Sequence, residues 1–202
     1  MASPPQVDRP PTGLRERKKA KTRASIQDHA LRLFREKGYD ATTVEEIAAA
    51  AEVSPSTFFR YFPTKEDVVL RDEYDPLMVE AFRAQPPQLT AIQAMRRSFR
   101  QVFDGIPPER LEQERQRIAL AMAVPELRAA SLDQFADTFR LLSQVVAERS
   151  GLPADDLGVR AVAGAVIGVA MAAMLAITED PATDLVAMMD AVMAKLEDGL
   201  PL

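Results

Sequence analysis

The segment from Thr42 to Lys65 constrains the fold more than any other part of the chain, because it carries two helix-start signals close together. Thr43 is followed three residues later by Glu46, which is the spacing of a capping box. Ser54 precedes Pro55, and this pair is typical of a helix cap followed by a proline in the first turn. Two short helices separated by a brief turn are therefore predicted, in the order of a helix-turn-helix.

The second short helix is expected to have distinct inner and outer sides. Phe58, with Tyr61 or Phe62, is predicted to face the interior. Side chains near the N-terminus of such a helix contact base edges in the DNA major groove, and flanking groups contact phosphates. Arg60 can donate to guanine O6 and N7, and Phe59 can contact a thymine methyl group. The candidate DNA-binding residues are Thr43, Ser54, Pro55, Ser56, Thr57, Phe59, Arg60, Tyr61 and Lys65.

Charge is unevenly distributed along the chain. The 202 residues carry a net charge of −5, but residues 1–65 hold 12 Lys and Arg against 8 Asp and Glu, whereas the remainder holds 13 against 22. Six basic residues fall between Arg15 and Arg23, ahead of a helical pattern that Gly38 is placed to end. A basic first part on an acidic remainder is typical of a protein whose N-terminal region meets a polyanion, and the basic run is expected to supplement the phosphate contacts.

The residue set is poor in groups for catalysis or metal binding. The chain has no cysteine and a single histidine, His29, so a thiolate site or a histidine cluster is not expected. Paired carboxylates such as Asp155 with Asp156 stand at charged helix ends, where solvation is the ordinary role. We expect no enzyme activity, no cofactor and no metal. Two alternatives stay open from the residues alone: a small helical enzyme, and a helical dimeric interaction module whose head contacts protein and not DNA.

Beyond residue 66 every segment has a helical pattern, and no strand alternation competes with it. The predicted fold class is all-α. The expected domains are a proline-rich disordered leader at 1–14, a helix-turn-helix domain at 15–66 and a helical domain at 67–202. A helix that starts at Asp67 is expected to run to Pro86, with a kink at Pro76.

The run from Ala161 to Thr178 is uncharged and has the apolar character of a membrane span. It is short of the roughly 20 residues that a span needs, and it is built from Ala and Gly more than from Leu and Phe. A buried helix of a soluble protein is therefore favoured, with no membrane partner. Gly164 and Gly168 lie four residues apart, which permits close approach of another helix, so a dimer face is favoured over an ordinary core helix.

Residues 21–70 resemble the DNA-binding head of TetR-family transcriptional regulators. The resemblance lies in Tyr39, in the Thr-Val-x-x-Ile-Ala pattern from Thr43, in the Thr-Phe-Phe-x-Tyr-Phe pattern from Thr57 and in the following Lys-Glu-Asp. The family pattern has glycine where this chain has Glu52. A non-glycine residue is thus expected at a turn position that requires positive φ.

This resemblance implies a three-helix head and a six-helix body that binds a small ligand. It also implies a cytoplasmic homodimer, joined through the last two helices at Ala161–Leu200, that acts as a repressor. Such a dimer binds double-stranded DNA at a palindromic operator until a small-molecule inducer releases it.

The expected inducer is of apolar or acyl type. The segment Arg117–Ala130 resembles the C-terminal domains of a subgroup that includes mycofactocin-associated regulators, some of which respond to acyl-CoA. Arg96, Arg100 or Arg117 could meet an acidic ligand group. Candidate ligand-binding residues are Met95, Phe99, Phe103, Arg117, Met122, Phe135 and Phe139, and the alternative for each is an ordinary place in the core.

Overall fold

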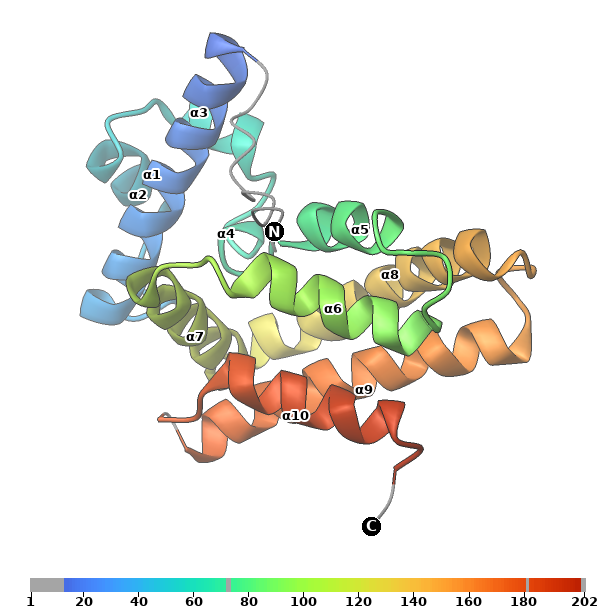
Figure 1. Ribbon diagram of the computed structural model, residues 1–202. Coiled ribbons are helices and arrows are strands. Elements are labelled where there is room, and N and C mark those ends of the chain that lie inside the picture. Colours follow the sequence, from blue (N-terminus) through green and yellow to red (C-terminus); the bar gives the residue numbers. More distant parts are fainter. Residues whose placement is uncertain (1–12, 72–73, 181, 201–202) are drawn as a thin grey trace. The chain divides into compact units, whose positions relative to one another are not determined.

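The computed structural model describes residues 13–71, 74–180 and 182–200, and every regular element in these ranges is helical. The helices, labelled in Figure 1, group into two units that divide after Arg71. We call residues up to Arg71 the N-terminal unit and residues from Asp72 the C-terminal unit. The predicted all-α class is confirmed. The predicted leader falls mainly on residues 1–12, which lie outside the described ranges.

Four helices form the described part of the N-terminal unit: α1 (Leu14–Lys37), α2 (Val44–Ala50), α3 (Pro55–Tyr61) and α4 (Asp67–Leu70). α1 ends where Gly38 adopts a positive φ of 88°, a conformation that glycine reaches without steric cost. Each helix, with its flanking residues, contributes buried apolar side chains. These include Ile26, Ala30, Phe34, Ile47, Ala48, Phe58, Phe62, Val68 and Val69.

Two helices stand where the sequence pattern predicted one continuous helix. α4 ends at Leu70, and α5 (Asp75–Arg83) is a separate helix, so the predicted single helix from Asp67 to Pro86 is wrong. Pro76 lies in the first turn of α5. A proline there loses no hydrogen bond, because the first amides of a helix have no intrahelical partner. Pro76 therefore starts a new helix and does not kink an old one.

The short helix α4 packs with the N-terminal unit. Its Val68 and Val69 are buried, and the side-chain amide of Gln27 on α1 donates to the Val68 carbonyl oxygen at 3.0 Å. The compact unit thus extends to Arg71, whereas the boundary drawn from the sequence stood after residue 66.

The described C-terminal unit has six helices, the number that the family resemblance implied. After α5 these are α6 (Ala91–Phe103), α7 (Pro108–Ala123), α8 (Pro125–Ser150), α9 (Leu157–Glu179) and α10 (Leu185–Glu197). α9 packs against α7, α8 and α10, while α6 packs against α5 and α10. Their shared apolar cluster includes Phe82, Met95, Phe99, Val145, Val159, Ala163 and Met193.

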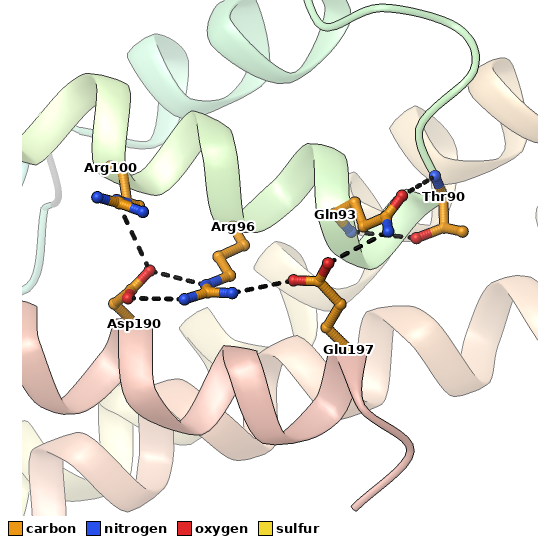
Figure 2. Close-up of polar contacts among 6 residues, drawn as sticks. All are labelled: Thr90, Gln93, Arg96, Arg100, Asp190 and Glu197. Carbon is orange, nitrogen blue, oxygen red and sulfur yellow. Dashed lines mark hydrogen bonds and ion pairs between the residues drawn. The ribbon is translucent and has the colours of Figure 1, made fainter.

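A group of polar side chains joins α6 to α10 (Figure 2). Arg96 donates from Nε and Nη2 to the two oxygens of Asp190, at 2.9 and 3.0 Å, and from Nη1 to Glu197 at 3.0 Å. Gln93 also donates to Glu197, at 3.2 Å, and is itself held by a capping box with Thr90. The hydrogen bonds from Arg96 lower the pKa of Asp190 and raise the pKa of Arg96. These contacts fix the polar side of α10 on α6.

α9 is the one helix in the described residues that has the length and apolar composition to cross a membrane. Within the chain, only 22% of its most apolar window is buried. One side packs on neighbouring helices, and the other carries exposed apolar residues that include Met171 and Leu175. The expectation of a buried helix therefore holds for one side of α9 alone.

Replacing Asp190 with Asn is expected to lower the free energy of unfolding by about 1 kcal/mol at neutral pH, because Arg96 then loses a bidentate but partly exposed partner. The folded-state pKa of Asp190 is lowered, so its contribution is complete above the ordinary aspartate pKa and is lost as pH falls through the lowered value. Scanning calorimetry from neutral to acidic pH measures both effects.

The control for this prediction is Asp137→Asn, which removes an exposed ion pair with Arg140. Exposed pairs contribute little, so this variant should unfold at nearly the wild-type temperature. Equal destabilisation of the two variants would show that the α6–α10 contact has no special weight.

Candidate functional site

α2 begins in a complete capping box. Thr43 Oγ1 accepts a hydrogen bond from the Glu46 amide at 3.2 Å, and Glu46 accepts one from the Thr43 amide at 3.0 Å. Lys37 donates to Glu46 at 2.6 Å, and this hydrogen bond lowers the pKa of the Glu46 carboxyl. The predicted box is confirmed, and it leaves Thr43 exposed at the start of α2.

Glu52 closes the turn between α2 and α3 with a φ of 56°, in the left-handed region. Its amide donates to the Ala49 carbonyl at 3.1 Å, and the next amide, of Val53, donates to the Ala48 carbonyl at 2.9 Å. A non-glycine residue in this conformation costs about 1 to 2 kcal/mol. This confirms that the position occupied by glycine in the family pattern requires positive φ.

α3 starts at a cluster of hydroxyl groups. Ser54 Oγ accepts from the Thr57 amide at 3.1 Å and lies 2.9 Å from Ser56 Oγ and 3.0 Å from Thr57 Oγ1. Pro55 occupies the first helical position. Ser54 therefore caps α3 as predicted. Ser54, Pro55 and Ser56 are exposed, and Thr57 is half-buried.

Adjacent phenylalanines set the two sides of α3. Phe58 is fully buried and Phe62, just past the helix, is 1% exposed, whereas Phe59 is 49% exposed. Arg60 is also exposed, and its guanidinium lies 5.5 Å from the ring centroid of the half-buried Tyr61. α3 thus presents Phe59 and Arg60 to solvent while its opposite side is anchored in the core.

Lys65 is engaged inside the N-terminal unit. Its Nζ donates to the carbonyl oxygens of Tyr39 at 3.0 Å and Thr42 at 3.3 Å, and lies 4.1 Å from the centroid of the Tyr39 ring. Thr42 is buried and donates to the Gly38 carbonyl at 2.8 Å. These contacts favour a role for Lys65 in holding the turn between α1 and α2, in place of the phosphate contact expected from the sequence.

Three candidate ligand-binding residues lie together on α6. Met95 and Phe99 are buried in the apolar cluster, and the half-buried Phe103 stacks on Phe99 with ring centroids 4.5 Å apart. Phe103 also contacts the ring of Tyr74, at 5.0 Å. Phe139 packs on the same cluster from α8.

Met122 and Phe135 are half-buried and are not among the described side chains that pack on this cluster. The structure therefore gathers Met95, Phe99, Phe103 and Phe139, and leaves the other two apolar candidates apart from that group.

Arg117 is a buried cation of the C-terminal unit. Its side chain is 9% exposed, and its Nε donates to Glu114 at 2.9 Å. Burial raises the pKa of Asp75, and the nearby charge of Arg117 opposes that rise. Arg96 and Arg100, the other arginines considered for an acidic ligand group, face Asp190 of α10 instead.

Tyr74 and Asp75 were not among the residues predicted for the ligand region. They lie at the start of α5, and the fold places them beside Phe103 and Arg117. Pro76 marks this helix start in the sequence, but a local pattern contains no information about which distant helix the turn approaches.

The capped pair α2 and α3, with an anchored second helix and an exposed Phe59 and Arg60, defines the N-terminal unit as the helix-turn-helix of a DNA-binding regulator. A model of the bacterial regulatory proteins of the tetR family matches residues 26–71, and a model of the MftR C-terminal domain matches residues 89–201. The chain belongs to the TetR family of transcriptional regulators. Members of this family are regulators and not enzymes.

Individual relatives agree with this assignment. The chain is 36% identical to the transcriptional regulator TcmR of Streptomyces glaucescens over 71% of its own length and 67% of that protein. It is 27% identical to the mycofactocin biosynthesis regulator MftR of Mycobacterium tuberculosis over 78% and 80% of the two chains. The structure of Thermus thermophilus FadR, a TetR-family repressor in complex with lauroyl-CoA, matches with a TM-score of 0.52 and 24% identity, over 89% of this chain and 95% of that one.

Lys65→Met is expected to lower the free energy of unfolding by about 1 kcal/mol, because two carbonyl oxygens lose their donor. It should leave the slope of log Kd against log salt concentration for DNA unchanged. A lysine that neutralises a phosphate contributes about 0.9 to that slope.

Lys37→Met is the matched control, because Lys37 donates to the exposed side chain of Glu46 and a smaller destabilisation is expected. Thermal denaturation and a salt titration of DNA binding together test the assignment. If Lys65→Met made the slope of log Kd against log salt concentration shallower and left stability unchanged, Lys65 would be a phosphate-contacting residue.

Proposed function

We propose that this protein is a homodimeric, cytoplasmic repressor that binds a palindromic operator and is released by a small-molecule ligand. The observation that carries the proposal is the division of α3 between a buried Phe58 and an exposed Phe59 and Arg60. The family assignment supports DNA binding, and the side-chain chemistry of α3 supports direct contact with base edges.

The exposed side of α3 has the groups that a major-groove helix needs. Arg60 carries a planar set of donors that fits guanine O6 and N7, and Phe59 offers an apolar surface to a thymine methyl group. The hydroxyl groups of Ser54, Ser56 and Thr57 lie at the helix N-terminus, where a phosphate can accept from them. In this proposal the exposed Thr43, at the start of α2, contributes a further phosphate contact.

The exposed side of α9 supports a homodimer. Among its uncovered residues, one set recurs at intervals of three and four, which places this set on one helix face. The set comprises Leu157, Ala161, Gly164, Gly168, Met171 and Leu175. Leu175 is 50% exposed, and the two glycines let a second helix approach closely. A two-fold dimer through this face would present two copies of α3 to half-sites about one helical turn apart.

The apolar group on α6 supports an apolar or acyl-type ligand. Met95, Phe99 and Phe103 provide an aromatic and aliphatic surface. Arg117 provides a cation near Asp75, and the neighbouring Tyr74 contacts the ring of Phe103. FadR of Thermus thermophilus, which shares the fold, has lauroyl-CoA in its structure. A ligand can release DNA only if it binds one conformation of the dimer better than the other.

Selection of bound duplexes from a random pool tests the function directly. Wild-type protein is expected to recover a two-fold symmetric site. Arg60→Ala should lose about 1 to 3 kcal/mol of affinity for that site and relax the preference at one base position in each half. Lys37→Met, which changes a cation outside α3, is the control and should keep the selected sequence. Recovery of no common sequence by the wild type would contradict operator binding.

The same complex tests ligand release. Acyl-CoA thioesters of increasing chain length, including lauroyl-CoA, are added to the protein–operator complex. Release that depends on chain length supports an acyl ligand, and a complex that no apolar or acyl compound disturbs contradicts this part of the proposal.

Placing a charge on the exposed face of α9 is expected to prevent dimer formation. Leu175→Glu should shift the mass measured by light scattering from dimer to monomer, because an unpaired carboxylate would be buried between two copies. Affinity for a full palindrome should fall more than affinity for a half-site. Leu132→Glu, at an exposed leucine of α8, is the matched control. A dimer that persists in Leu175→Glu and dissociates in Leu132→Glu would contradict an interface on α9 and would place it on α8.

A further inference from the structure

Ser56 shares the exposed side of α3 with Phe59 and Arg60. The three residues stand at positions i, i+3 and i+4, and residues at this spacing lie on one face of a helix. All three are exposed, whereas Phe58 and Phe62 hold the other side of the helix in the core. In the proposed complex, a helix that turns Phe59 and Arg60 toward base edges therefore turns Ser56 toward them as well.

The hydroxyl group of Ser54 is fully used within the protein. A serine hydroxyl has one hydrogen to donate and two lone pairs that accept. Ser54 donates its hydrogen to Thr57 Oγ1 at 3.0 Å and accepts from the Thr57 amide at 3.1 Å. Its Oγ also lies 2.9 Å from Ser56 Oγ. Because the hydrogen of Ser54 is already donated to Thr57, Ser56 must be the donor in this second contact.

The hydrogen bond to Ser54 fixes the polarity of Ser56. The single hydroxyl hydrogen of Ser56 is directed at Ser54, so the exposed Ser56 Oγ can accept from a DNA base but has no hydrogen to donate to one. In the major groove, adenine N6 and cytosine N4 carry hydrogens, whereas guanine and thymine present acceptors. An acceptor at Ser56 therefore matches adenine or cytosine and gives no hydrogen bond to guanine or thymine.

We propose that Ser56 reads a base that carries an amino group, adenine or cytosine, in each half of the operator. This inference rests on the proposed operator binding. Arg60 has only donors and fits guanine, so the two neighbouring side chains make opposite demands on the sequence.

The same count of hydrogens limits the phosphate contacts of this cluster. Among Ser54, Ser56 and Thr57, the hydroxyl of Thr57 alone keeps a hydrogen for a phosphate, and no residue in the described ranges accepts it. The phosphate contact proposed for these three hydroxyl groups is therefore assigned to Thr57.

Selection of duplexes from a random pool by wild type and by Ser56→Ala tests the base preference. Wild type should select adenine or cytosine at one position in each half-site, and this position should differ from the one that Arg60 reads. Ser56→Ala should accept all four bases there and should keep the preference at the other positions. Thr22→Ala, which removes a hydroxyl from α1, is the matched control and should keep the whole selected sequence.

Ser54→Gly tests whether the bond to Ser54 is the source of the preference. Glycine is tolerated as a helix cap, so α3 should still form, and circular dichroism checks that the variant is folded. The change removes the acceptor of the Ser56 hydrogen. Ser56 can then donate as well as accept, so this variant should also select guanine or thymine at the position in question.

A base analogue isolates the amino group itself. Purine in place of adenine, or pyrimidin-2-one in place of cytosine, lacks the exocyclic amino group at that position. Wild type should bind the modified duplex about threefold to tenfold more weakly than the natural one, which is the effect of one neutral hydrogen bond. Ser56→Ala should bind the two duplexes alike. Fluorescence anisotropy measures the four dissociation constants.

Three results would overturn the assignment of Ser56 while operator binding stands. They are guanine or thymine in the wild-type operator at the position that Ser56→Ala relaxes, an unchanged selected sequence in Ser56→Ala or Ser54→Gly, and an equal loss of affinity by wild type and Ser56→Ala with the analogue. If the wild type selects no common sequence, operator binding itself fails, and the assignment of Ser56 falls with it.

Discussion

The burial of Phe58 and Phe62 in the N-terminal unit determines how α3 can function. Both rings are removed from solvent, and together they fix the rotation of a helix only seven residues long. An isolated helix of that length is not stable in water, so its order depends on these anchors. Because these two rings fix the rotation of the helix, the side chains of Phe59 and Arg60 face solvent. The outward side is the side that a DNA groove can meet.

The turn before α3 adds a second constraint. Glu52 holds a left-handed backbone conformation that glycine would adopt at no steric cost. The amides of Glu52 and Val53 donate to carbonyl oxygens in the last turn of α2, and these hydrogen bonds end the helix. Lys65 contributes from the other end of the motif, where it ties the carbonyl oxygens of Tyr39 and Thr42. The exposed side of α3 is therefore small, but it is held in place by core packing, by a strained turn and by the half-buried cation of Lys65.

The features that the sequence predicted correctly are local ones. The cap at Ser54, the capping box at Thr43 and the glycine stop at Gly38 each depend on residues within one helical turn, so the sequence contains all the information needed. The sequence predicted one helix with a kink at Pro76, whereas a new helix starts there. Proline fits both a kink and a first turn, and tertiary packing decides between them.

Contacts between distant segments could not be foreseen in the same way. The periodicity of α1 does not show that the Tyr39 and Thr42 carbonyls receive Lys65, nor does that of α5 show that Tyr74 meets Phe103. Such pairs depend on how helices cross, which hydrophobic period alone leaves open. The same limit explains why the fold groups only four of the apolar candidate ligand residues, Met95, Phe99, Phe103 and Phe139.

The most direct test of the central claim is methylation protection of guanine N7 on a selected operator, because this atom lies in the major groove, where we propose that α3 binds. The account predicts two protected patches about one helical turn, about 10 bp, apart, with protection at the matching guanine abolished in both when Arg60 is replaced. No protection of guanine N7, or a pattern that does not change on replacement of Arg60, would contradict the assignment of α3 as the reading helix.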